Sequence, residues 1–113
     1  MTDITITKAA GIWTVAAEGA IIGESSNALE LREGGLAPVI YFPRADITMS
    51  FFDPVAHSAD CPAKGTASYY SVITKSRTIE NAAWSYEDPS VEASQIKGHL
   101  AFHANDWITV EQV

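Results

Sequence analysis

Short segments in which apolar and polar residues alternate restrict the fold of this chain more than any other feature. Ile4 and Ile6 fall on one side of residues 3–7 if that segment is extended, and Leu29 and Leu31 do so in residues 27–33. This period of two indicates half-buried β-strands, because successive side chains of a strand point to opposite faces. Further β-like segments cover residues 11–19, 20–25, 39–42, 46–52, 66–74, 78–86, 99–103 and 107–113. Gly, Pro and Asp residues separate many of them, so the sequence predicts a mainly β chain.

One segment, around residues 90–97, favours a helix. Asp88 is placed to cap its start, Pro89 suits its first position and Gly98 suits its exit. A helix this short depends on packing for its stability. Residues 53–65 are predicted to form a loop. A chain of 113 residues suits one domain over residues 1–113, with a core large enough to need no metal or disulfide.

The charge of the chain disfavours nucleic acid as a partner. Fourteen acidic and seven basic residues give a net charge of −7. The basic residues form no stripe that would bind a phosphate backbone. They are Lys8, Arg32, Arg44, Lys64, Lys75, Arg77 and Lys97.

The sequence predicts a cytoplasmic protein rather than an exported or membrane-bound one. A lone cysteine, Cys61, cannot form an internal disulfide, which agrees with a cytoplasmic protein. Residues 8–23 have some features of a secretion signal, since Lys8 precedes an apolar run. However, Asp3 lies upstream, and Glu18 and Gly19 interrupt the run. No apolar segment is long enough to span a bilayer.

Four motifs, in order, bear a resemblance to a known family. They are Y-F-P-x-x-D at 41–46, C-P-x-K-G at 61–65, A-W-x-Y-x-x-P at 83–89 and I-x-G-x-x-A-F at 96–102. With these motifs the chain resembles the bacterial domain-of-unknown-function 427 family over nearly its whole length. The resemblance implies a β-tent-like fold of compact, folded-over antiparallel sheets, an architecture shared with methionine sulfoxide reductase B and the thalidomide-binding domain of cereblon.

The resemblance does not supply a cofactor or an activity. Many β-tent proteins bind a structural zinc through two Cys-x-x-Cys pairs, and this chain has neither, so we expect no zinc. Ala63 stands where the family usually has tyrosine. A nucleotidyltransferase label is sometimes attached to the family, but the chain lacks a phosphate-cradling glycine loop and a paired-aspartate motif.

The leading functional hypothesis is a small-molecule site with aromatic walls. Trp84 and Tyr86 point to one side of an extended segment, Tyr69 lies on the preceding strand, and Tyr41 precedes the Pro43 stop. Such side chains can stack on a flat or cationic ligand, although ordinary core packing is the alternative for each. Polar anchors would come from Arg44, Asp46, Cys61 and Lys64, all within the family-like motifs.

Arg44 and Asp46 also suit a structural turn, which needs no ligand to explain it. Glu33 is a possible partner of either Arg44 or Lys64.

Two other hypotheses stay open. In a thiol-dependent enzyme, Cys61 would be the nucleophile, His57 its base and Lys64 its electrostatic activator. The alternative for Cys61 is a partly buried side chain in a turn between Pro62 and Gly65. A structural or interaction domain would instead pair through exposed strand edges, as a monomer or a weak homo-oligomer.

His99 and His103 do not predict a metal site. If residues 99–103 form a strand, Leu100 and Phe102 face the core, whereas the two histidines and Ala101 face solvent. A metal would then need ligands from a distant loop.

Overall fold

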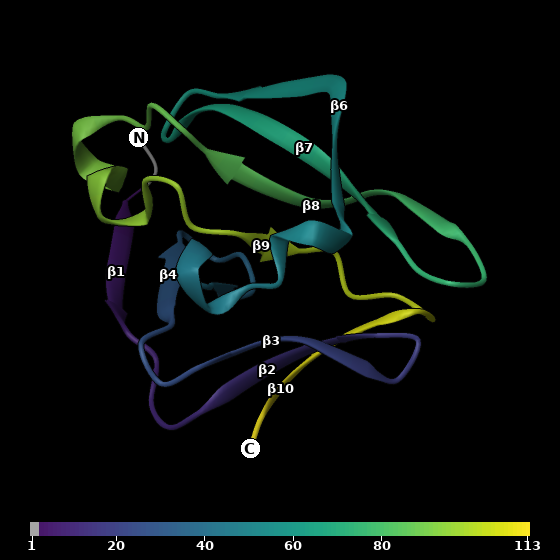
Figure 1. The fold of residues 1–113 in the computed structure, drawn as a ribbon. Coiled ribbons are helices and arrows are strands. Elements are labelled where there is room, and N and C mark those ends of the chain that lie inside the picture. The colour runs from purple at the N-terminus through teal and green to yellow at the C-terminus, as the bar shows by residue number, and fades with distance from the viewer. Residues whose placement is uncertain (1–2) are drawn as a thin grey trace.

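The computed structural model describes residues 3–113, which form ten β-strands and three short 3₁₀ helices (Figure 1). The strands are β1 (Ile4–Lys8), β2 (Trp13–Ala17), β3 (Ala20–Ser25), β4 (Leu29–Glu33), β5 (Val39–Tyr41), β6 (Phe52–Cys61), β7 (Gly65–Ile73), β8 (Thr78–Tyr86), β9 (Ala101–Phe102) and β10 (Ile108–Gln112). The helices are η1 (Arg44–Asp46), η2 (Met49–Phe51) and η3 (Val91–Ile96). The prediction of a mainly β fold is confirmed.

The strands form three antiparallel sheets with the orders β1-β4-β5, β10-β2-β3 and β6-β7-β8-β9. Figure 1 shows the four-stranded sheet folded over the other two, as expected for a folded-over arrangement. The chain reverses in tight hairpins between β2 and β3 and between β7 and β8.

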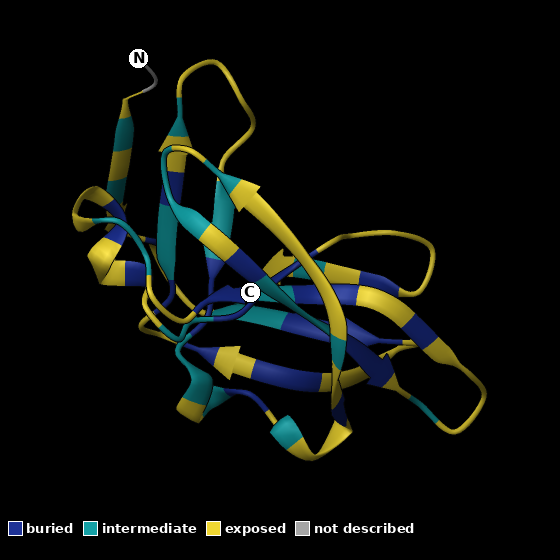
Figure 2. Cartoon of the chain, turned by 90° about the horizontal axis from the view of Figure 1, so that it is seen from above, coloured by how far each residue is buried: buried dark blue, intermediate teal, exposed yellow. Residues whose placement is uncertain are grey.

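The four-stranded sheet has hydrophobic side chains packed on both faces. Alternate residues of β7 show this: Ala67 and Tyr69 pack toward β4, β5 and η3, whereas Tyr70 and Val72 pack toward the sheet of β2, β3 and β10. Figure 2 shows the buried residues concentrated where the strands cross and the exposed ones in the loops and along much of β6. Two hydrophobic clusters therefore share one sheet.

The four family-like motifs contact one another. Phe42 and Leu100 exchange two main-chain hydrogen bonds of 2.8 and 2.9 Å, which join the first motif to the fourth. The amide of Gly98 donates to the carbonyl of Tyr86 at 3.0 Å, which joins the fourth to the third. The amide of Ser90, one residue beyond the third motif, donates to the carbonyl of Lys64 at 2.9 Å. The motifs thus build the junction between the sheets.

The predicted loop at residues 53–65 is wrong for most of its length. Residues 53–61 belong to β6, which pairs with β7 from Cys61 opposite Gly65 back to Phe52 opposite Val72. Most of β6 is exposed, so it lacks the apolar alternation that identifies a strand from sequence. Its main-chain pairing with β7 determines its conformation instead.

Two other predicted elements differ from the structure. Residues 46–52, predicted to be a strand, mostly form the end of η1 and all of η2. The β-like parts are an isolated bridge from Ile47 to Gly23 and Phe52, which begins β6. The predicted helix at 90–97 is the 3₁₀ helix η3, which begins after Ser90 without a side-chain cap, so Asp88 does not cap it. Short helical segments of this kind commonly adopt 3₁₀ geometry, and η3 is anchored by buried Ala93 and Ile96.

The prediction that one side of residues 99–103 faces solvent holds for His103, which is exposed, but it is wrong for Ala101. Leu100 and Phe102 pack in one cluster as expected, but Ala101 is fully buried in the other. The reason is that β9 lies beside β8, in the sheet that is covered on both faces.

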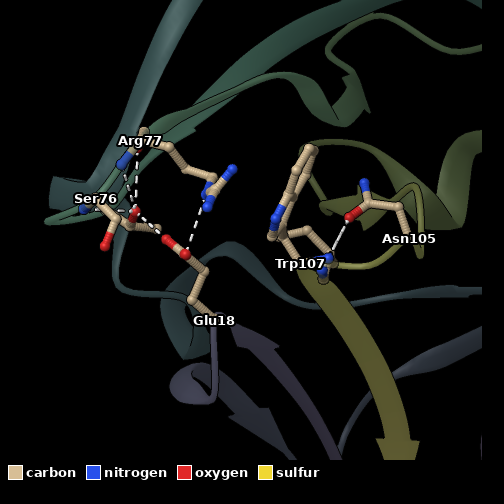
Figure 3. Close-up of polar contacts among 7 residues, drawn as sticks. Glu18, Ser76, Arg77, Asn105 and Trp107 are labelled. Atoms are coloured by element: carbon tan, nitrogen blue, oxygen red, sulfur yellow. Dashed lines mark hydrogen bonds and ion pairs between the residues drawn. The ribbon is translucent and has the colours of Figure 1, made fainter.

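Polar contacts stabilise the ends of the β2–β3 and β7–β8 hairpins (Figure 3). Arg77 donates to Glu18 at 3.0 Å and its guanidinium lies 4.5 Å from the centre of the Trp107 ring. The side-chain oxygen of Asn105 accepts a hydrogen bond of 2.7 Å from the main-chain amide of Trp107. These contacts join the β2–β3 turn, the β7–β8 turn and the loop before β10. Within residues 3–113, no helix is long and apolar enough to cross a membrane.

Candidate functional site

A cavity of about 230 Å³ lies between the four-stranded sheet and the β4–β5 hairpin. Its lining combines aromatic, aliphatic and charged side chains: Leu31, Glu33, Leu36, Ala37, Val39, Tyr41, Lys64, Tyr69, Trp84, Tyr86 and His103. Five of the eight residues predicted to bind a ligand meet here, namely Tyr41, Lys64, Tyr69, Trp84 and Tyr86.

Trp84 is the centre of the aromatic wall. Strand register places Tyr69 of β7 directly opposite Trp84 of β8, with ring centres 6.4 Å apart. The Tyr41 ring meets Trp84 edge-on at 6.4 Å, and the indole N–H of Trp84 donates to the Tyr41 hydroxyl at 3.2 Å. The ring of His103 also contacts Trp84, with 4.4 Å between ring centres. The hydrogen bond and the edge contact hold the indole in one orientation.

A nearly buried ion pair supplies charge to the cavity. The Lys64 ammonium contacts Oε1 of Glu33, and their side chains are only 11% and 14% exposed. Burial alone would lower the pKa of Lys64, but its hydrogen bond to Glu33 and the neighbouring Cys61 side chain outweigh burial and raise the pKa. Lys64 also lies 6.0 Å from the centre of the Tyr86 ring. Lys64 is therefore a charged donor whose charge Glu33 balances.

Two buried tyrosines add hydroxyl groups. Tyr41 and Tyr86 are 1% and 5% exposed. Burial raises the pKa of both phenols, against a smaller opposing effect of the Trp84 hydrogen bond at Tyr41. Both hydroxyls therefore keep their protons at neutral pH.

The turn at 61–65 positions Lys64. The Lys64 amide donates to the Cys61 carbonyl at 3.1 Å, and the Ser90 hydroxyl donates to the Ala63 carbonyl at 2.7 Å. Gly65 ends the turn at φ +114°, a backbone conformation that glycine adopts without strain. An added Cβ there would lie 3.2 Å from the Asp88 carbonyl oxygen.

We expect Gly65→Ala to lower the free energy of unfolding by about 1–3 kcal/mol, because alanine is strained at this φ and crowds Asp88. Chemical denaturation of the variant measures the loss. Gly35→Ala is the matched control, since its added Cβ meets no atom within 4 Å. Equal stability of the two variants would contradict the assignment of Gly65 as a conformationally required residue.

Cys61 and His57 do not form a nucleophile–base pair. Cys61 is half-buried and packs against the same hydrophobic cluster as the cavity walls. His57 lies four residues earlier on β6, and its ring faces Tyr69 with 4.6 Å between centres. Four residues of extended strand span roughly 13 Å, which exceeds hydrogen-bond reach.

Arg44 and Asp46 lie outside this cavity. Arg44 donates to the Gly98 carbonyl at 3.1 Å and to Glu87 at 2.6 Å. The Ser25 hydroxyl donates to Asp46 at 2.6 Å. Both residues thus hold the η1 turn to neighbouring segments of the chain. Glu33 is the partner of Lys64, which decides between the two partners that the sequence left open.

His103 and the loop residues Leu36 and Ala37 were not among the predicted site residues. His103 was assigned to a solvent face, because the sequence does not show that the chain after β9 runs beside Trp84. No motif contains Leu36 or Ala37. They reach the cavity because the β4–β5 hairpin folds over it.

Two larger cavities lie elsewhere and contain fewer of the predicted residues. One, of about 400 Å³, lies at the hairpin ends and is lined by residues such as Phe51, Ile73 and Lys75. The other, of about 360 Å³, lies behind Trp84 and Val39 and includes Trp13 and Phe102. Only the 230 Å³ cavity combines several aromatic rings with a buried ion pair among the three. No group of three or more His, Cys, Asp or Glu side chains within residues 3–113 is arranged to bind a metal.

The fold and cavity define a small antiparallel β protein whose sheets enclose an aromatic-walled hollow. A comparison with protein families matches residues 5–113 to the domain of unknown function DUF427. The match covers nearly the whole chain, so the protein belongs to the DUF427 family. A search of curated proteins finds no match.

Proposed function

We propose that this protein binds a small, flat molecule in the 230 Å³ cavity, stacked against Trp84. The observation that supports this most directly is the meeting of Tyr41, Tyr69, Trp84 and Tyr86 around one hollow with the Lys64–Glu33 pair. Ligand sites typically combine mostly apolar walls with a few polar groups that orient the ligand.

The arrangement of the rings favours a planar ligand. Trp84 has Tyr41 edge-on at one side and Tyr69 and His103 beside it, all within 6.4 Å between centres. These rings are held by sheet pairing and by the Trp84–Tyr41 hydrogen bond, so the wall is largely formed before a ligand arrives. Preorganisation of this kind lowers the cost of ordering side chains on binding.

A thermal-shift screen against a broad set of metabolites tests the proposal. We expect at least one flat compound to raise the melting temperature, since a ligand at 100 times its Kd stabilises the folded state by about 2.7 kcal/mol. The same compound should quench tryptophan fluorescence. Trp84→Leu should abolish both effects, because it removes the main stacking surface.

Trp107→Leu is the matched control, because Trp107 lies at the hairpin ends beside Arg77 (Figure 3) and does not line this cavity. Circular dichroism establishes that both variants fold. A library without any stabilising compound, or a shift that survives in Trp84→Leu, would overturn the proposal.

A further inference from the structure

Building on the proposed function, we infer that the ligand is an uncharged aromatic carboxamide, whose ring stacks on Trp84 and whose amide meets the Lys64–Glu33 pair and the Tyr86 hydroxyl. The inference depends on the polar groups of the cavity rather than on its aromatic walls. An experiment can therefore rule out this ligand class without ruling out small-molecule binding.

The Tyr86 hydroxyl has no hydrogen-bond partner among residues 3–113, although the residue is only 5% exposed and lines the cavity. No fully buried side-chain oxygen or nitrogen in the described chain lacks a partner, so this hydroxyl is accessible, and the cavity is the hollow that Tyr86 lines. Tyr86 thus offers a donor to whatever occupies the hollow.

The ion pair places a donor and an acceptor side by side. Lys64 uses one N–H on Oε1 of Glu33 and another on the Cys61 side chain, and an ammonium has three, so one N–H stays available. Oε2 of Glu33 remains able to accept a hydrogen bond. A carboxamide has the complementary pair of groups, a carbonyl oxygen that accepts and an NH₂ that donates. One carboxamide can therefore accept a hydrogen bond from Lys64 or from Tyr86 and, at the same time, donate one to Glu33.

The charge balance of the cavity disfavours both an anionic and a cationic ligand. A ligand carboxylate would meet the Glu33 carboxylate, and a ligand cation would meet the Lys64 ammonium, both in a nearly buried setting. Either would have to compete with an existing ion pair and leave one of its members uncompensated. A neutral head group leaves the pair intact.

The volume of the cavity limits the size of the ligand. About 230 Å³ is below the range of roughly 300–1,000 Å³ that is typical of drug-sized ligands. A single aromatic ring with a short polar substituent suits this volume better than a nucleotide or a peptide. Benzamide is therefore a suitable probe.

Three probes that share one ring test the inference: benzamide, benzoate and benzamidine. Isothermal titration calorimetry or ligand-observed NMR gives their relative affinities for the wild-type chain. We expect benzamide to bind at least tenfold more tightly than either charged probe. Tyr86→Phe should weaken benzamide about fivefold or more, and Tyr70→Phe, on the other face of β7, should leave it unchanged.

The outcomes separate the two proposals. Tighter binding of benzamidine or benzoate, or a Tyr86→Phe variant that binds benzamide as wild type does, would overturn the carboxamide class while supporting small-molecule binding. Hits from the metabolite screen that bind through Trp84 but contain no amide, with no benzamide binding, would also overturn it. If neither the probes nor the library bind, both proposals fail.

Discussion

Replacing Lys64 with methionine is expected to lower the free energy of unfolding by about 3 kcal/mol. The substitution keeps the aliphatic part of the side chain but leaves the Glu33 carboxylate nearly buried without its cation. Urea denaturation at neutral pH measures the loss.

Two further variants separate the unpaired charge from the pair itself. Lys64→Met combined with Glu33→Leu removes both charges, and we expect its stability to lie within about 1 kcal/mol of wild type. Arg32→Met breaks the Arg32–Glu30 pair, in which the Arg32 side chain is 61% exposed, and should change stability by at most about 0.5 kcal/mol. A loss for Lys64→Met no larger than that for Arg32→Met would contradict the buried ion pair.

Phe42→Ala is expected to lower the free energy of unfolding by about 4 kcal/mol. Phe42 is fully buried in the cluster between the sheets and meets Phe102 edge-on, with 5.8 Å between ring centres. Its main-chain bonds to Leu100 remain in the variant, so the loss reports the side chain and the cavity that it leaves. Thermal and urea denaturation should show the same direction of change.

Phe51→Ala is the comparison, because Phe51 has the same side chain but is 43% exposed in η2. We expect it to lose less than about 1 kcal/mol. If Phe42→Ala were equally mild, Phe42 would not belong to a tightly packed core.

The aromatic members of the site could be predicted from sequence because they fall on strands with regular alternation. Trp84 and Tyr86 are two residues apart on β8, and both pack in the same cluster. Cross-strand register then brings Tyr69 opposite Trp84. These relations follow from the period of a strand and from antiparallel pairing of neighbouring strands.

The polar members of the site could not be predicted from sequence in the same way. Lys64, Arg44 and Asp46 all lie in turns of family-like motifs, yet only Lys64 reaches the cavity. A turn residue has no periodicity that fixes its direction. Its side chain follows the path of the main chain, which at Lys64 depends on hydrogen bonds from Ser90, far along the sequence.

The sequence by itself determined that the chain is mainly β, that it belongs with the DUF427 family, and which aromatic side chains share a strand face. These properties depend on local alternation and on motifs that are contiguous in the chain. Only the tertiary structure decided that β6 is a strand, that Glu33 pairs with Lys64, and that His103 lies against Trp84. Each of these depends on contacts between distant segments, whose geometry is set when the sheets fold over one another.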